Sequence, residues 1–313
     1  MDAPLGVAAV LSEALCLARR SKRHMLPCLL LALIPSSLLL AAGSHVSVYS
    51  LLLGFIARLH SLDRENPATP RFFGLLIRLK SDAAALSHAN ATLAAASHLG
   101  HFASTVIIAH AAAAACAGRH LPAKDLLQKL AESWRTGPLE TYLYSTLLSA
   151  GYTALSVSLI AVPALNTAAG PSPRLAVVAA AAAAAAARFL YIYLAMVWAV
   201  GVVVSILEDG CRGLEAMHRA GEAVRGRRAQ GFLIAVVLAI ANASAGLGRG
   251  GPGWRDVLAR AAHLLVGVFS PMVYTVFYHE CRKNHGGDGA PPELPRRSKV
   301  DHDRQGAGVV AAV

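Results

Sequence analysis

Two uncharged apolar runs on either side of a charged helical segment constrain the fold more than any other feature of this sequence. The runs are residues 189–207 and 231–246. Together with the charged segment between them, they contain the stretch from Trp198 to Ile240. About 20 apolar residues are needed to cross the hydrocarbon core of a bilayer. Because lipid offers the backbone no hydrogen-bond partner, such a crossing segment must be a helix. We therefore predict an all-α, polytopic membrane protein.

The composition agrees with this class and argues against nucleic-acid binding. Hydrophobic residues make up 55% of the chain and charged residues 15%, against about 25% charged residues in ordinary soluble domains. The mean hydropathy is +0.49. The net charge of +11 comes from basic residues between the apolar runs. This placement is typical of residues that flank membrane spans and contact anionic lipid. We expect membrane lipids, and no nucleic acid, as partners.

The apolar runs predict a six-span helical bundle between residues 25 and 283. The predicted spans are residues 25–43, 92–117, 141–165, 189–207, 231–246 and 261–279. A signal peptide is the alternative for the first run, but the 24 residues before it are longer than a usual leader segment. Residues 44–80 could be lumenal or could dip into the membrane surface. Residues 284–313 are rich in Gly, Pro and charge, and are predicted to form a disordered cytoplasmic tail.

Three amphipathic segments are predicted to lie on the cytoplasmic membrane surface. They are residues 5–18, within the N-terminal segment 1–24, then 124–134 and 208–224. Each precedes a pair of spans, which suggests a threefold repeat of surface helix plus hairpin. In the third segment, one face is apolar or small at Leu207, Cys211, Leu214, Met217, Gly221 and Val224. The other face carries Glu208–Arg212 and Glu215–Arg219, two pairs with the favourable four-residue spacing.

The distribution of basic residues predicts that both termini are cytoplasmic. The side of the termini carries nearly twice as many lysines and arginines as the other side. The five basic residues between residues 57 and 91 are the main departure from this bias. The sequence leaves the endoplasmic reticulum, the Golgi and the plasma membrane open as locations. Cys16, Cys211 and Cys281 lie near membrane ends, where palmitoylation can occur.

Few ionisable side chains fall within the predicted spans. His98, His101 and His110 lie in the second span, and they would line a polar cavity together with Arg188 if the protein is a transporter. Arg188 also fits an interfacial position beside Tyr191. The predicted spans contain no Asp or Glu, and the sequence contains no GxSxG, HExxH or Walker A motif. We therefore predict no catalytic site, no cofactor and no metal.

Two stretches carry a resemblance to a known family. They are VVVSILEDGCRGLEAMHRAGEAVRGRR at 202–228 and MVYTVFYHECRKNH at 272–285. With the LLALIPSSLLL run, they resemble a plant family of uncharacterised polytopic membrane proteins. The first stretch is also similar to the membrane domain that accompanies bacterial glycerophosphodiester phosphodiesterases. The resemblance implies a layout of about six spans and supplies no catalytic residues, because the phosphodiesterase domain itself has no counterpart here.

Three functional classes follow from these observations. The first, which we favour, is a non-enzymatic endomembrane protein that organises membrane or protein partners through its cytoplasmic helices. The second is a transporter of small solutes or metabolites, suggested by the six spans and the histidines of the second span. The third is a lipid-modifying membrane enzyme, in which a histidine or cysteine would act at the interface.

Overall fold

The described part of the chain is helical throughout. The structure is a computed structural model that describes residues 6–20, 30, 48–65, 69–119, 122–134, 137–167, 173–208, 210–247 and 254–284. Within these ranges there is no β-strand, and the all-α prediction is confirmed for them. The helices are α1 (Val7–Arg20), α3 (Val48–Asp63), α4 (Pro70–Cys116), α5 (Ala123–Ser133), α6 (Gly137–Thr167), α7 (Pro173–Leu207), α8 (Gly213–Ala223), the short 3₁₀ helix η1 (Arg225–Arg227), α9 (Arg228–Leu247) and α10 (Trp254–Asn284).

Within the described residues, four helices are long and apolar enough to cross a membrane, as expected of a helical membrane protein. They contain Pro70–Cys116, Val178–Leu207, Arg225–Gly246 and Val257–Lys283. These segments cover four of the six predicted spans. The predicted span at 141–165 is helical as part of α6, but it is not among these four. The predicted span at 25–43 lies outside the described residues, except for Leu30.

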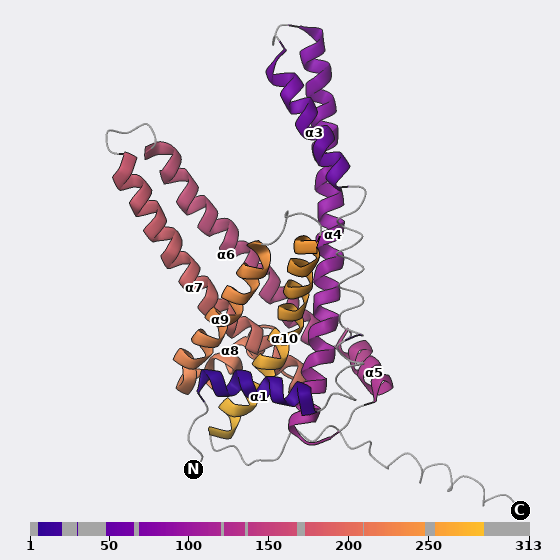
Figure 1. Cartoon of the computed structure of the whole chain (residues 1–313), viewed down its shortest axis with the longest axis vertical. Helices are drawn as coiled ribbons and strands as arrows, with labels where there is room; N and C mark the ends of the chain where they lie inside the picture. The colour runs from indigo at the N-terminus through magenta and orange to yellow at the C-terminus, as the bar shows by residue number, and fades with distance from the viewer. Residues whose placement is uncertain are drawn as a thin grey trace, which may run out of the picture.

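The amphipathic helices α1, α5 and α8 gather at one end of the bundle, which we call the base (Figure 1). The long helices run away from the base as the hairpins α3–α4, α6–α7 and α9–α10 (Figure 1). Along the chain, α5 precedes α6–α7 and α8 precedes α9–α10. This order agrees with the second and third units of the predicted repeat. The connection from α1 to α3 falls outside the described residues.

The main core lies where the base helices meet the long helices. Buried apolar side chains of seven described helices form it: Val10 and Ala14 of α1, Ile108 of α4, Leu126 of α5, Met196 and Val203 of α7, Ala216 and Ala220 of α8, Ile234 of α9, and Val273 and Phe277 of α10. Because α1 contributes to this core, it packs against protein as well as facing outward. The base is therefore an integral part of the fold.

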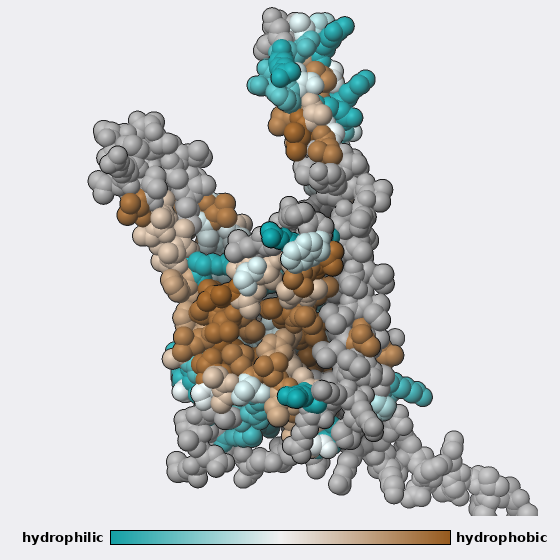
Figure 2. All heavy atoms as spheres, in the orientation of Figure 1, coloured by the Kyte–Doolittle hydropathy of each residue, from teal (hydrophilic) through white to brown (hydrophobic). Residues whose placement is uncertain are grey.

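An apolar band covers the outward faces of α9 and α10. Figure 2 shows this hydrophobic surface between hydrophilic patches at the base and at the far ends of the two helices. Leu233, Val237 and Ile240 contribute to it from α9, and Leu265 from α10, each at least 43% exposed. Their spacing of three and four residues on α9 places them on one face. A band of this kind is suited to contact with lipid chains.

The third amphipathic segment differs from its prediction at its start and in its face. Gly210 and Gly213 have φ values of +86° and +58°, a backbone conformation that glycine adopts without strain. The chain therefore turns after α7, and α8 begins at Gly213 instead of Leu207 or Glu208. Leu214, predicted on the apolar face of this segment, is 64% exposed. The buried face of α8 instead consists of the small or flexible residues Gly213, Ala216, Met217 and Ala220.

Close packing against α7 explains which face of α8 is buried. A Cβ atom added to Gly201 of α7 would lie 3.3 Å from the Cα atom of Met217. Helices approach this closely only where one side lacks a side chain. The small residues of α8 therefore face the protein, and the larger Leu214 is turned outward. The predicted apolar face and the buried face share Met217 but differ at Leu214, because the close approach to α7 admits small or flexible side chains.

Candidate functional site

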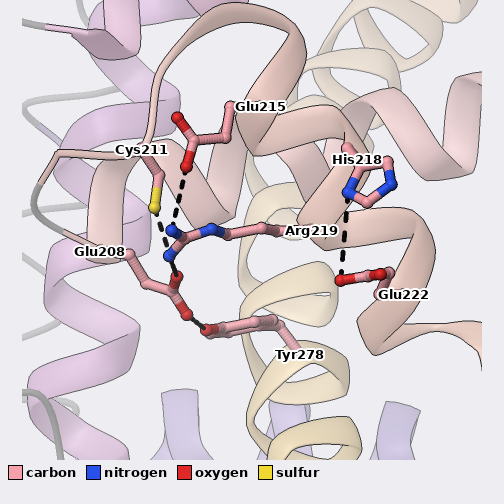
Figure 3. A network of polar contacts seen from close by, with 7 residues as sticks. All are labelled: Glu208, Cys211, Glu215, His218, Arg219, Glu222 and Tyr278. Carbon is pink, nitrogen blue, oxygen red and sulfur yellow. Dashed lines mark hydrogen bonds and ion pairs between the residues drawn. The ribbon is translucent and has the colours of Figure 1, made fainter.

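A network of charged and polar side chains joins α7, α8 and α10 at the base (Figure 3). Glu208 follows the last residue of α7 and accepts a hydrogen bond from the hydroxyl group of Tyr278 on α10. Arg219 of α8 donates through Nη1 to Glu208 Oε2 at 3.3 Å. Its Nη2 donates to Glu215 Oε1 at 2.9 Å. One carboxylate thus connects three helices that are separated in the sequence.

The surroundings of Glu208 keep it ionised at neutral pH. Burial alone would raise the pKa of this carboxyl group, but hydrogen bonds from Tyr278, Cys211 and Arg219 stabilise the charged form, and the net pKa is lowered. The Cys211 Sγ atom lies 3.5 Å from Glu208 Oε2. Burial raises the pKa of the Cys211 thiol, which therefore stays protonated and serves as a donor. The network is an ion-pair junction with no activated nucleophile at Cys211.

A second ion-pair cluster ties η1 to the end of α10. Arg227 Nη1 lies 3.7 Å from Glu280 Oε2, and both side chains are about nine-tenths buried. Lys283 Nζ donates to Glu280 Oε1 at 2.9 Å from an exposed position. Removing one partner from a buried pair leaves the other charge uncompensated. We infer that this cluster fixes the start of α9 against α10.

A hydrogen bond to α6 completes the attachment of α8. The backbone N–H of Gly213 donates to Thr141 Oγ1 at 2.8 Å. A Cβ atom added to Gly137 would lie 2.5 Å from the Cβ atom of Arg212, so the start of α6 and the turn before α8 pack backbone to backbone. With the contacts to α7 and α10, this bond holds α8 on three sides.

The predicted pairs of the third amphipathic segment form only in part. The Glu215–Arg219 pair is present with the predicted four-residue spacing. The prediction of a Glu208–Arg212 pair was wrong, because both residues precede α8. Glu208 pairs with Arg219 instead. The sequence prediction did not identify Tyr278 as the second partner of Glu208, since the two residues are 70 positions apart. The local signal was the pair of glycines, Gly210 and Gly213, that follows Glu208.

The predicted histidines do not form one group. His98 Nδ1 lies 3.5 Å from Tyr142 Oη, and the His101 ring centroid lies 6.3 Å from that of Tyr142. His263 of α10 is close enough to His101 for electrostatic interaction, and the sequence prediction did not include it. His110 instead lies toward the base, near Lys129 of α5. No three His, Cys, Asp or Glu side chains in the described ranges are placed to hold a metal ion.

Arg188 is separate from the histidines. Its guanidinium carbon lies 5.5 Å from the centroid of the Tyr191 ring on the same helix, a cation–π arrangement. Tyr191 in turn shares a 2.7 Å hydrogen bond with Ser149 of α6. Among the described contacts of Arg188, no hydrogen bond or ion pair joins it to His98, His101 or His110. An exposed arginine stacked on tyrosine suits the interfacial alternative better than the cavity.

The cysteines at the base divide into exposed and buried pairs, which predicts their reactivity. Cys16 and Cys116 are exposed, whereas Cys211 and Cys281 are 3% and 1% exposed. Burial argues against palmitoylation of the latter two in the folded protein. In a Cys28→Ser background, a polar maleimide should label two cysteines of the native protein and two more after denaturation. Mass spectrometry identifies the sites, and labelling of native Cys211 or Cys281 would contradict the packing of the base.

A comparison with known families assigns the chain to a family. The family model described as "Domain of unknown function (DUF8558)" matches residues 3–248, most of the chain. No curated protein and no solved structure matches it. The resemblance to plant proteins and to the phosphodiesterase-associated membrane domain stays a prediction. The matched region includes the described helices from α1 to α9. The chain therefore belongs to the DUF8558 family.

Proposed function

We propose that this protein is a non-enzymatic endomembrane protein that organises lipids and protein partners through its base. The observation that carries the proposal is the attachment of the amphipathic helix α8 to α6, α7 and α10 by hydrogen bonds and ion pairs. A helix held on three sides is presented in a fixed orientation. Its outer face carries Leu214 and His218, both of which are exposed. A rigid surface of this kind suits docking, because little side-chain and backbone freedom is lost on binding.

Arginines at the start of α9 support a role for anionic lipid in this function. Arg225 and Arg228 are exposed where α9 begins, while Arg227 between them is anchored to Glu280. No acidic residue occurs between Ala223 and Leu247 in the sequence. Basic residues beside a span attract anionic headgroups by about 1 kcal/mol each. We expect the base to face the cytoplasm, in agreement with the charge bias of the sequence.

Lipid retention tests this proposal directly. The protein is purified in mild detergent with equal amounts of phosphatidylcholine and phosphatidylserine, and the lipids that remain bound are identified by native mass spectrometry. We expect enrichment of phosphatidylserine, and its loss in the Arg225→Gln/Arg228→Gln variant. The Arg64→Gln variant, at the far end of the molecule, serves as the matched control. Equal retention of both lipids by the unaltered protein would overturn the lipid part of the proposal.

A transporter is the second candidate, because polar rings from three helices meet in the long-helix region. His98 and His101 of α4 lie beside Tyr142 of α6, and His263 of α10 lies near His101. A proton or cation pathway would need polar groups of this kind. Solute uptake into proteoliposomes, compared between the unaltered protein and the His101→Ala variant, tests this alternative. Uptake that depends on His101 would favour transport over the organising role.

A further inference from the structure

The α3–α4 hairpin extends far beyond the rest of the bundle, on the side opposite the base (Figure 1). Helix α4 has 47 residues, which corresponds to a length of about 70 Å. Residues 92–116 are sufficient to cross the roughly 30 Å of hydrocarbon. The remaining residues, 70–91, therefore extend about 30 Å from the bilayer. Because α4 is one continuous helix, its N-terminal end is held away from the membrane that its C-terminal half crosses.

Helix α3 stiffens this projection by packing along α4. The half-buried residues of α4 in the hairpin recur every three or four positions at Phe72, Leu75, Leu79, Asp82 and Leu86. This spacing defines a single seam along one face. Arg58 of α3 forms an ion pair with Asp82 inside the seam. The charge of Asp82 is thereby compensated within the hairpin.

The face of α4 away from this seam combines large apolar side chains with positive charge. Phe73, Leu76 and Ile77 are 58%, 45% and 69% exposed, and they fall within roughly 100° of the helix circumference at 100° per residue. Lys80 lies within the same sector. Arg71 and Arg78 are also exposed, but they lie on the flank of α4 between this sector and the seam with α3, roughly 100–120° from Ile77 at 100° per residue. The segment 70–81 contains no acidic residue.

We propose that this segment, residues 70–80 and here called the tip, docks on the anionic phospholipid surface of an apposed membrane. Exposed Phe and Leu or Ile side chains beside Lys and Arg are the combination by which a helix inserts shallowly into an anionic interface. The rigid projection keeps the tip from its own bilayer, so docking joins two membranes. The protein is then a membrane tether, an activity separate from the role of the base.

The proposal also accounts for the departure from the charge bias. The hairpin carries the five basic residues that oppose the predicted orientation: Arg58, Arg64, Arg71, Arg78 and Lys80. Arg58 is engaged by Asp82, and the tip has Lys80 within its apolar face and Arg71 and Arg78 exposed on the flank of the same helix. Residues that bind lipid in trans need not follow the rule for residues that orient a span. The tip and the Arg58–Asp82 pair therefore account for four of the five.

Co-flotation of nanodiscs with vesicles tests the tether. The full-length protein is placed in phosphatidylcholine nanodiscs, which leave both sides of the bilayer accessible. These nanodiscs are mixed with vesicles of phosphatidylcholine alone or with phosphatidylserine. We expect the nanodiscs to float only with the anionic vesicles. Added salt should reduce this binding. The Arg71→Gln/Arg78→Gln/Lys80→Gln and Phe73→Ser/Ile77→Ser variants should each reduce binding by about tenfold or more.

The matched control is the base variant Arg225→Gln/Arg228→Gln, which should float as the unaltered protein does. Loss of flotation in this control, with none in the tip variants, would assign binding to the base and overturn the tether. Equal binding to neutral vesicles would also overturn it. Association of nanodiscs with one another, abolished by Phe73→Ser/Ile77→Ser, would show that a second copy occupies the tip instead of lipid. Lipid retention at the base is unaffected by these outcomes, so the two proposals can fail independently.

Discussion

The Gly231→Leu variant is expected to lose about 3 kcal/mol of stability or more, the upper part of the range for overpacked cores. Gly231 lies near the start of α9, where this helix meets α7 and α10. A Cβ atom at this position would lie 2.9 Å from Phe277 Cζ and 3.1 Å from Met196 Sδ. Both neighbours are fully buried, so the Phe277 ring has no free space into which it can turn. A leucine side chain therefore forces α9 away from the core.

Gly221→Ala is the matched control for this prediction. Gly221 is also a helical glycine, in α8, but a Cβ atom added to it has nothing within 4 Å. Alanine is favoured over glycine in a helix interior by roughly 0.5–1 kcal/mol, so this variant should be slightly more stable. Thermal unfolding in detergent, followed by loss of the monodisperse peak in size-exclusion chromatography, measures both variants. A Gly231→Leu protein with an unchanged unfolding midpoint would show that α9 does not pack against Phe277 as described.

The helices could be predicted from the sequence because their signal is local. The apolar runs 231–246 and 261–279 lie within α9 and α10, and the segment 124–134 corresponds closely to α5. The bounds differ because hydrophobicity marks the part of a helix that meets lipid, whereas helix propensity decides how far the helix continues. Helix α4 shows this most clearly. Its residues 70–91, which mix apolar and charged side chains, continue the helix well before the predicted span at 92–117 begins.

The base network was less predictable because its contacts are non-local. The Glu215–Arg219 pair follows from spacing on one helix, but the bond from Tyr278 to Glu208 depends on how α10 packs against α7. Gly210 and Gly213 indicated a turn that the sequence prediction did not include. Two glycines so close together favour a turn over a continuous helix. With the turn recognised, Glu208 would have been placed at the end of α7, where residues of other helices can reach it.

Replacement of Glu208 by glutamine is expected to destabilise the protein by about 2 kcal/mol at neutral pH, within the range for hydrogen bonds to a charged group. The glutamine side chain can still accept from Tyr278, but it no longer compensates Arg219 with a charge. The side chains of Glu208 and Arg219 are 25% and 50% exposed, so solvent weakens this ion pair and keeps the loss near the lower end of that range. Chemical unfolding of both proteins in the same detergent measures the difference.

The difference between the two proteins should depend on pH in a direction fixed by the pKa of Glu208. The hydrogen bonds hold this pKa in the folded protein below its ordinary value of 4.5. The stabilisation is therefore complete above pH 4.5 and is lost as the pH falls through the lower, folded-state pKa. The difference in unfolding free energy between the unaltered protein and Glu208→Gln should be constant from pH 7 to about pH 5 and should shrink below that.

Glu222→Gln separates this effect from the general response of carboxylates to acid. The Glu222 side chain is 62% exposed, and its one described ion-pair partner is His218 at 4.0 Å. An exposed pair of this kind contributes little to stability. The Glu222→Gln protein should therefore match the unaltered protein at every pH. If Glu208→Gln behaves in the same way, Glu208 does not join α7, α8 and α10. The fixed presentation of α8, on which the organising role of the base depends, would then lose its physical cause.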